Sequence, residues 1–475
     1  MQNSLLKLPL VLFFIFLSLG CQHNETENVD WTMPFILLEG GELNKVKGWA
    51  DSIKKTSVKY DEKWMKADSL ARIAKRIAID FKISESEVRE QLVTKVGEYT
   101  EEEWSDWNSS GLLEGRVLDG EMHYFKRAAS NLAILTGRGD GLLDKALDAF
   151  CLKHSEEVLD EIDVSNRSRV KKQNFVIDFV VSVDKDAVPA GDTIRCWLPF
   201  PKELHGRQTN VKLINVTPGD YILSNDTCVH RSVYVEQLAV AGEKTEFRLK
   251  FSFDAQAEYI DLSKHNVLPY DEESAVFKEY TKEQLPHIAF THNIKHLADS
   301  ICGDTSDPVA EVRDIYYWID KNIPWAGALE YGIMPNIPEY VLKNRKGDCG
   351  MQTLLFMAMA RYRGIPVRWQ SGWMLHPGEE NLHDWCEVYY EGVGWVPLDM
   401  SFGLQQSEDH RLREFYISGI DAWRLIINDG IGAQFCPSKV FLRSEPWDFQ
   451  RGEVEWKEGN LYFNHWDYHL SVSRQ

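Results

Sequence analysis

The sequence predicts an α+β fold in which a helical region and a β-sandwich module precede a core of mixed helices and strands. Three observations support this prediction. Apolar residues recur with the helical period of 3.6 up to about residue 165, the period changes to two from about residue 174, and helical patterns return after a linker at about residues 259–274. A chain of 475 residues exceeds the size at which one core keeps growing, so two to four domains are expected.

The composition is that of a soluble globular protein. Hydrophobic residues make up 44% of the chain and charged residues 27%. The formal net charge is -20, so no basic surplus exists to neutralise phosphates and a nucleic-acid partner is not expected. We interpret the acidic surplus as a contribution to solubility, with attraction of cationic substrates as the alternative.

The N-terminal segment is not expected to belong to the fold. Residues 8–19 form an apolar run that is too short to span a bilayer comfortably and is typical of a signal peptide, here residues 1–21. The small residue followed by Cys21 resembles a bacterial lipoprotein processing site, which implies that Cys21 is lipidated. Residues 22–30 are then a polar tether, and the protein is expected in the cell envelope, lipid-anchored to the periplasmic or surface face of the outer membrane.

Residues 31–170 are predicted to form a helical domain. Four apolar residues between positions 70 and 77 fall on one face of a helix. Ser84 followed by Glu87 has the spacing of a capping box, which satisfies free amides at a helix start. Helical patterns continue over residues 121–135. Nothing in this region indicates a chemical site.

Residues 171–270 are predicted to form the β-sandwich domain. Phe175, Ile177 and Phe179 alternate with their neighbours, as in a strand with one buried face. Turns that contain Pro218-Gly219 and Ala241-Gly242 separate further short strands. Short strands at such regular spacing are typical of a β-sandwich.

The core, residues 285–429, is predicted to begin with helices. Asp307 can cap a helix that has Pro308 at its first position, and the helix ends before Pro324 because the residue before proline avoids helical geometry. A loop rich in glycine and proline follows. A helix is also predicted over residues 415–427, and a hairpin around Gly459-Asn460 ends the chain in residues 430–475.

One cysteine stands at a position that favours chemistry. Gly347-Asp348-Cys349 precedes an apolar run that ends at Gly364, so Cys349 should begin a buried helix. The free amides and the dipole at a helix N-terminus favour a thiolate and lower the thiol pKa, and the same amides could hold an oxyanion. The alternative is that Cys349 is a buried structural thiol.

A histidine and an aspartate follow the cysteine in two predicted strands. His383 begins one strand, and Asp399 ends the next after a tight glycine turn. Antiparallel neighbours bring these two residues to the same rim of the sheet. A helix packed on that sheet can present Cys349 to His383, which gives the arrangement of nucleophile, base and orienting carboxylate found in thiol acyl-transfer sites.

Four motifs together resemble the transglutaminase-like superfamily. They are the Gly-x-Cys helix start, Gly-Ile-Pro-x-Arg at residues 364–368, His-x-Trp at 383–385 and Trp-x-x-Leu-Asp at 395–399. The resemblance covers residues 285–429 and implies a papain-like transglutaminase core. It further implies Cys349 as nucleophile, His383 as general base and acid, and Asp399 as the residue that fixes the imidazole.

Other residues are weaker candidates. The resemblance makes Trp325 the oxyanion candidate, with Tyr331 behind it. His376 is expected in a turn without a strand partner, which makes it the lesser choice for the base. Asp384 neighbours His383 on a strand and should point to the opposite face, so it should not orient His383.

A Cys-His-Asp site forms an acyl-enzyme from an amide and passes the acyl group to water or to an amine. For an exported lipoprotein we expect hydrolysis, that is, a transglutaminase-like cysteine peptidase or amidase acting on peptide or protein amides, with glycopeptide linkages as the second choice. The alternatives are a transglutaminase that crosslinks Gln to Lys, and a surface lipoprotein that binds without catalysis. No cofactor is expected.

The remaining cysteines leave a disulfide open. An oxidising compartment permits disulfides, and Cys196 could pair with Cys228 because both lie in the strand-rich region. No Cys-x-x-Cys pair exists, so a structural zinc site is not expected. No metal-binding residues are predicted.

Overall fold

The structure is a computed structural model that describes residues 29–139 and 145–474. The signal peptide, Cys21 and most of the tether lie outside these residues, so what was predicted for them stays a prediction. Within the described part of the chain, no helix is both long and apolar enough to cross a bilayer.

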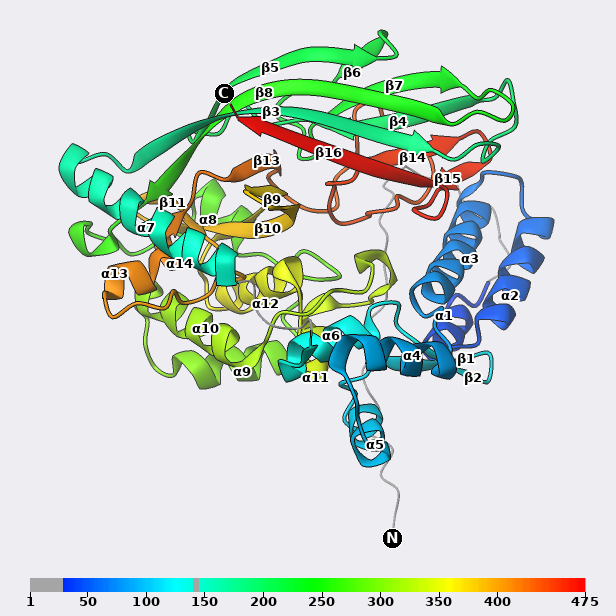
Figure 1. Cartoon of the computed structure of the whole chain (residues 1–475), viewed down its shortest axis with the longest axis horizontal. Helices are drawn as coiled ribbons and strands as arrows, with labels where there is room; N and C mark the ends of the chain where they lie inside the picture. The colour runs from blue at the N-terminus through cyan, green and yellow to red at the C-terminus, as the bar shows by residue number, and fades with distance from the viewer. Residues whose placement is uncertain (1–28, 140–144, 475) are drawn as a thin grey trace.

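The N-terminal region is helical, and its first three helices lie together at one end of the molecule (Figure 1). The predicted capping box at Ser84 and Glu87 is present. The helix expected from residue 121 begins at Ala128 instead, because Asp119 and Gly120 adopt positive φ and turn a small hairpin. The elements are α1 (Thr32–Glu39), α2 (Leu43–Thr56), α3 (Glu62–Asp80), α4 (Glu85–Val96), α5 (Glu101–Ser109), β1 (Gly115–Leu118), β2 (Glu121–Tyr124), α6 (Ala128–Thr136) and α7 (Lys145–Ser165).

The strand-rich region contributes to two antiparallel sheets of five strands. In one sheet, β3 pairs with β8 along most of its length. Buried side chains of both sheets, such as Phe179 and Trp197, belong to one apolar cluster, while the description of this arrangement as a sandwich stays a prediction. The strands are β3 (Arg169–Val183), β4 (Thr193–Pro199), β5 (Gln208–Thr217), β6 (Tyr221–Leu223), β7 (Ser232–Leu238) and β8 (Thr245–Tyr259).

The C-terminal segment supplies strands to both of these sheets. The last strand, β16 (Trp466–Arg474), lies along β3, as Figure 1 shows in red. The hairpin of β14 (Glu453–Trp456) and β15 (Gly459–Leu461) joins the other sheet through β4. Its turn lies at Lys457 and Glu458, two residues before the predicted Gly459-Asn460 turn. The chain end is therefore built into the fold rather than appended to it.

The core contains a four-stranded antiparallel sheet in the order β11-β10-β9-β13. Helix α12 packs on it, and every residue from Cys349 to Arg361 is buried. Side chains of α12 share an apolar cluster with Cys386 and Val388 of β10. The elements are α8 (Ala275–Tyr280), α9 (His292–Cys302), α10 (Pro308–Asn322), α11 (Ile337–Asn344), α12 (Cys349–Tyr362), β9 (Val367–His376), β10 (Glu379–Tyr390), β11 (Gly394–Leu398), α13 (His410–Arg413), α14 (Phe415–Ser418), β12 (Gly419–Ile420) and β13 (Arg424–Asn428).

The prediction of one helix over residues 415–427 is wrong. Only α14 is helical there, and the chain then forms β12, which pairs with β8, and β13, which pairs with β9. Leu425, Ile426 and Ile427 are all buried, and an apolar run of this kind suits a strand covered on both faces. Pairing with β9 therefore makes residues 424–428 a strand, although the local sequence pattern favours a helix.

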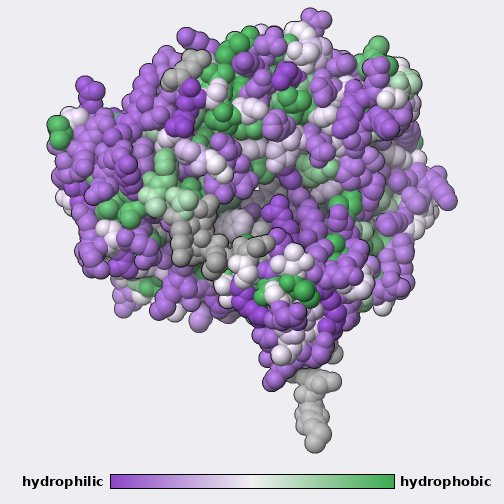
Figure 2. All heavy atoms as spheres, in the orientation of Figure 1, coloured by the Kyte–Doolittle hydropathy of each residue, from purple (hydrophilic) through white to green (hydrophobic). Residues whose placement is uncertain are grey.

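The predicted α+β class is confirmed: the N-terminal region is mainly helical, and helices and antiparallel strands mix in the core. The face of the molecule shown in Figure 2 is mostly hydrophilic, and its hydrophobic residues lie in small groups.

We expect the last strand to be needed for stability. Trp466 is 2% exposed, pairs with Val183, and donates a hydrogen bond from Nε1 to the Leu461 carbonyl at 2.9 Å. Trp466→Ala should lower the free energy of unfolding by about 3–5 kcal/mol, because it leaves a cavity in the core. Denaturant titration of both proteins measures the change.

The neighbouring substitution Asp467→Ala is the matched control, since that side chain is exposed on the same strand. It should change the free energy of unfolding by less than about 0.5 kcal/mol. Equal stabilities for the two variants would show that β16 is a dispensable extension.

Candidate active site

Cys349 is the first residue of α12, at the N-terminus of a buried helix as predicted. The preceding Asp348 caps the helix, and its carboxylate accepts a hydrogen bond from the Met351 amide at 3.0 Å. Gly347 forms a parallel bridge with Trp325, which fixes the helix start against the loop before it. The cap at Asp348 and the bridge at Gly347 thus place the Cys349 thiol at the helix start.

The thiol contacts a carboxylate. Sγ of Cys349 lies 3.4 Å from Oδ2 of Asp384 and donates a hydrogen bond to it. Burial, followed by the charges of Asp384 and Asp348, raises the pKa of the Cys349 thiol well above its ordinary value. The sequence predicted a lowered pKa from the helix N-terminus alone. The prediction was wrong in direction because desolvation and two nearby carboxylates both oppose the thiolate.

Gly350 is required where the helix start meets Asp384. A Cβ at this position would lie 2.1 Å from the Tyr331 Oη and 2.5 Å from Oδ2 of Asp384. Tyr331 in turn donates a hydrogen bond to the Asp348 carboxylate at 2.6 Å, and its Oη lies 3.5 Å from Oδ2 of Asp384. The absence of a side chain at Gly350 lets the tyrosine and the two carboxyls gather around the sulfur.

The structure brings His383 and Asp399 together. Nε2 of His383 lies 2.7 Å from Oδ2 of Asp399, within hydrogen-bond distance, and the Ser401 amide donates to Oδ1 at 3.0 Å. Both residues are buried. This is the contact that the hairpin of β10 and β11 predicts for an imidazole and its orienting carboxylate.

A buried arginine, Arg424, joins His383 and Asp399 in a second polar cluster. Nη1 of Arg424 forms an ion pair with Oδ2 of Asp399 at 2.8 Å, and Nη2 pairs with Asp421 at 2.7 Å. Burial alone would raise the pKa of Asp399, but the charges of His383 and Arg424 hold it below its ordinary value. Burial lowers the pKa of His383; the Asp399 charge opposes this shift and the Arg424 charge adds to it, and the net lowering counts against the positively charged imidazole.

The structure does not bring Cys349 to His383. Among the described residues, no hydrogen bond or ion pair joins the two side chains, and the thiol contacts Asp384 instead. Successive residues of a strand point to opposite faces. Asp384 and Cys386 face α12, whereas His383 stacks beside Trp385 on the other face.

His376 differs from its prediction. It is the last residue of β9 and pairs with Glu379 of β10, so it has the strand partner that the sequence did not predict. Its Nε2 lies 3.3 Å from Oδ1 of Asp421. His376 therefore belongs to the buried polar cluster around Arg424 and Asp421 and does not contact the cysteine by any hydrogen bond or ion pair among the described residues.

Three residues near Cys349 were not predicted as part of the site. Asp384 accepts a hydrogen bond from Nε2 of Gln450 at 2.8 Å, and Asp448 lines the same cavity as Cys349. Strand alternation could have placed Asp384 toward α12. No sequence signal points to Asp448 or Gln450, because they come from an irregular segment about a hundred residues after the cysteine.

A cavity of about 210 Å³ lies over the thiol. Trp325, the predicted oxyanion candidate, lines it with its side chain 39% exposed, and Tyr331 lies deeper beside Asp348. Several parts of the chain form its wall. They are Lys126 and Arg127 before α6, the loop over residues 325–332 with Asp348 and Cys349, Asn381, Leu382 and Asp384 of β10, the C-terminal residues Ser444, Glu445, Trp447, Asp448, Gln450 and Arg451, and Tyr468 of β16.

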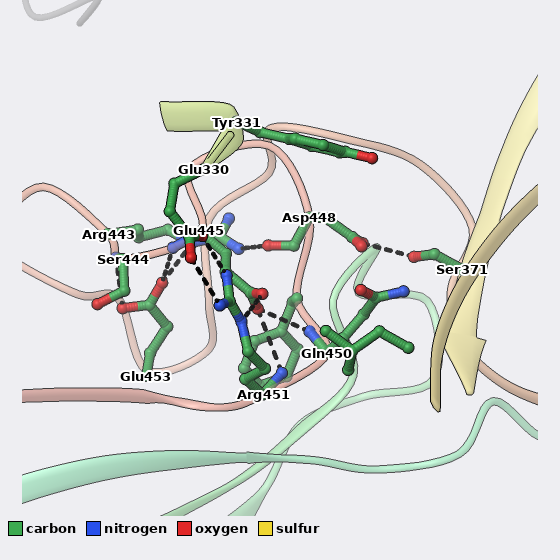
Figure 3. A network of polar contacts seen from close by, with 12 residues as sticks. Glu330, Tyr331, Ser371, Arg443, Ser444, Glu445, Asp448, Gln450, Arg451 and Glu453 are labelled. Atoms are coloured by element: carbon green, nitrogen blue, oxygen red, sulfur yellow. Dashed lines mark hydrogen bonds and ion pairs between the residues drawn. The ribbon is translucent and has the colours of Figure 1, made fainter. Parts of the chain in front are cut away.

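Ion pairs fix the C-terminal wall of this cavity (Figure 3). Arg451 pairs with Glu330 at 2.7 Å and with Glu445, so it ties the C-terminal segment to the loop that carries Tyr331. Oδ1 of Asp448 accepts a hydrogen bond from the Ser371 hydroxyl of β9. The carboxyl group of Asp448 is thereby held toward the sheet that carries Asp384.

The cysteines are free thiols. All seven that the structure describes lack a disulfide, so Cys196 and Cys228 are not paired. Cys196 is buried in the sheet cluster.

Comparison with known families identifies the core. Residues 295–400 match the family model described as the transglutaminase-like superfamily, a range that includes Cys349, His383 and Asp399. No curated protein matches the sequence.

Solved structures with similar folds include a candidate cysteine protease from Cytophaga hutchinsonii, 15% identical, which covers 64% of this chain and 92% of its own, with a TM-score of 0.43. The periplasmic domain of TgpA from Pseudomonas aeruginosa is 14% identical, covers 53% of this chain and 94% of its own, and has a TM-score of 0.26.

We expect Arg424 to stabilise the group that holds His383. Arg424→Met leaves Asp399 and Asp421 buried without their cation, so the free energy of unfolding at neutral pH should fall by about 3–5 kcal/mol. Both carboxyls have pKa values below the ordinary one, so their charges stabilise the fold above the unfolded pKa and cease to do so as pH falls. The deficit of the variant should therefore shrink below about pH 4.

Arg248→Met is the matched control, because Arg248 forms an exposed pair with Asp178. It should cost no more than about 1 kcal/mol. Denaturant titrations from pH 3 to pH 8 measure both variants, and a deficit for Arg424→Met that grows on acidification would contradict the charge assignment.

Proposed function

Because residues 295–400 form a transglutaminase-like domain, we propose that this chain is a thiol-dependent hydrolase or acyl transferase that acts on amide bonds of peptides or proteins. The observation that carries the proposal is the position of Cys349. Its sulfur lies at the N-terminus of α12 and lines a cavity that the surrounding loops leave over it. A nucleophile, free amides and room for a small acyl group thus occur at one place.

The proposed reaction has two half-reactions. The sulfur of Cys349 attacks the amide carbonyl, the amine leaves, and an acyl-enzyme thioester remains, which water or an amine then resolves. The amides at the start of α12 are the proposed donors to the oxyanion. Trp325 stays a proposed second donor, supported by its place in the cavity wall.

His383 and Asp399 stay proposed members of the site. Their hydrogen bond supports an orienting role for Asp399, as in other triads. His383 and Asp399 lie on the opposite face of the sheet from Asp384. The proposal therefore rests on Cys349 and its cavity, and not on a hydrogen-bonded Cys-His-Asp triad.

Hydrolysis is the proposed outcome, and the resolving nucleophile decides between it and crosslinking. A soluble chain that begins after Cys21 should cleave members of a peptide library, and Cys349→Ala should abolish cleavage because no thioester can form. Mass spectrometry of the products, with and without an added primary amine, measures the reaction. Amine adducts formed in preference to acids would favour transglutamination.

Cys349→Ser is the second variant, since it keeps a hydroxyl in place of the thiol and disturbs packing least. Cleavage that persists in both variants would contradict a thiol enzyme. Binding of peptides without turnover by the wild-type protein would instead support the non-catalytic surface lipoprotein.

We also propose that the protein is held in the cell envelope by a lipid on Cys21. The support is the sequence pattern alone, because these residues lie outside the described part of the chain. The full chain should fractionate with membranes, and Cys21→Ala should not carry lipid. Intact-mass measurement of the mature N-terminus tests this, and an unmodified Cys21 on a membrane-free protein would contradict it.

A further inference from the structure

A second cavity lies between helix α3 and the C-terminal hairpin of β14 and β15. Its volume is about 220 Å³, and none of its described lining residues belongs to the cavity over Cys349. A cavity smaller than the roughly 300–1,000 Å³ of drug-sized pockets suits a small ligand or one group of a larger ligand. The polar residues that line it are Arg72, Lys75, Arg76, Asn460, Tyr462 and His465.

This cavity is basic, although the whole chain has a net charge of -20. Three cations line it from α3, and no Asp or Glu is found among its described lining residues. Arg72 shares a helix face with Lys75 and Arg76, because residues three and four apart are neighbours on a helix surface. His465 comes from the segment between β15 and β16. A concave surface with this charge attracts anions.

Arg72 holds the two walls of the cavity together. Its Nε pairs with Oδ2 of Asp68 at 2.5 Å, and its Nη1 donates a hydrogen bond to the Asn460 carbonyl at 3.2 Å. Gly459 allows this approach, since a Cβ there would lie 2.2 Å from Nη2 of Arg72. The charge of Arg72 therefore already has a carboxylate partner.

The charge of Arg76 has no such partner. Its side chain is buried, and its Nη1 and Nη2 donate to the carbonyls of Arg443 and Leu442 at 2.8 and 3.2 Å. No ion pair joins it to a carboxylate among the described residues. Burial lowers the pKa of the Arg76 guanidinium, although the charges of Glu453 and Glu330 oppose this shift. A buried cation without an ion pair is costly, and a bound anion would offset that cost.

Lys75 and His465 provide further donors. Lys75 is exposed and forms neither a hydrogen bond nor an ion pair with a described residue. Burial, and then the Lys75 charge, lower the pKa of His465, and the Asp184 charge opposes this shift. The imidazole is therefore neutral at neutral pH and keeps one ring N–H that can donate a hydrogen bond.

A buried hydroxyl beside these cations also lacks a partner. Tyr462 is 7% exposed, and its Oη forms no hydrogen bond within the part of the chain that the structure describes. The Arg76 guanidinium lies over the tyrosine ring, with Cζ 4.5 Å from the ring centroid. Buried hydroxyls are normally paired, so an acceptor bound beside Arg76 would supply the partner that Tyr462 lacks.

From these observations we propose that the cavity binds a phosphate group. A phosphate monoester carries roughly two negative charges at neutral pH, which match the two cations that have no ion pair, Lys75 and Arg76. Tyr462 and His465 are the proposed hydrogen-bond donors to its oxygens. A carboxylate carries one charge and would leave one of the two cations unmatched. The chemistry is the same for a soluble phosphate ester and for a lipid headgroup, and the site is independent of the function proposed above.

Calorimetric titration tests the site directly. The protein is the chain that begins after Cys21, which contains every described residue, and the probes are inorganic phosphate and glycerol 3-phosphate at constant ionic strength. We expect saturable binding at one site per chain and a Tm that rises with probe concentration, because a ligand that binds only the folded state stabilises it. Acetate should bind about tenfold more weakly or not at all, since it lacks the second charge. Equal affinity for acetate would contradict the assignment to phosphate.

Lys75→Glu is the first variant, because this exposed side chain contributes no described contact to the fold. Its affinity for glycerol 3-phosphate should fall by about tenfold or more, the usual effect of losing a hydrogen bond between charged groups. Lys63→Glu is the matched control, with the same charge change on the same helix outside the cavity. Equal losses in the two variants would reveal a general charge effect and overturn the site.

Tyr462→Phe is the second variant, since it keeps the ring beneath Arg76 and removes only the hydroxyl. The affinity for glycerol 3-phosphate should fall by about threefold to tenfold. The free energy of unfolding without ligand should not fall, because the hydroxyl has no partner to lose. Unchanged affinity together with lower stability would contradict a role of this hydroxyl in binding.

Vesicles distinguish the two sources of the phosphate group. Co-sedimentation with phosphatidylcholine vesicles that contain phosphatidic acid, abolished by Lys75→Glu, would assign the site to a lipid headgroup. Saturable binding of glycerol 3-phosphate without vesicle binding would assign it to a soluble ester. Absence of saturable binding in every arm, by protein that circular dichroism shows to be folded, would overturn the proposal.

Discussion

The alternation of side chains along β10 is the constraint on which the site depends. Residues 383 and 384 are neighbours in the chain, yet a strand turns them to opposite faces of the sheet. Asp384 accepts a hydrogen bond from Cys349 on the face that carries α12, and His383 lies within hydrogen-bond distance of Asp399 on the opposite face. Helix α12 packs tightly against this strand, so the sulfur cannot move from one face to the other without disturbing the core.

Each face of the sheet carries its own cluster of polar side chains. Segments that are distant in the sequence contribute residues to both clusters. On one face, Arg424 of β13 forms ion pairs with both Asp399 and Asp421. On the other, the segment from Ser444 to Arg451 brings Gln450 to Asp384 and lines the cavity. The strands after that segment belong to the two large sheets, so the shape of the site depends on the correct folding of the chain end.

The sequence was sufficient for features that depend on local patterns. The helix that begins at Cys349 and the hairpin that joins His383 to Asp399 follow from a cap, an apolar run and a glycine turn. Three features were not predictable in this way. The strand at residues 424–428 forms only because β9 offers a partner, the raised pKa of Cys349 reflects three-dimensional burial, and Asp448 reaches the site through a segment without regular structure.

The most direct test of a thiol acyl-transfer site is the covalent intermediate itself. A peptide that the protein cleaves should be mixed with it, quenched in acid within the first turnover, and the protein digested and mapped by mass spectrometry. We expect the acyl group of the peptide on the sulfur of Cys349, and none on the buried Cys386 nearby in the core. Product accumulation without any adduct on Cys349, under conditions that trap thioesters, would contradict the assignment of this cysteine as the nucleophile.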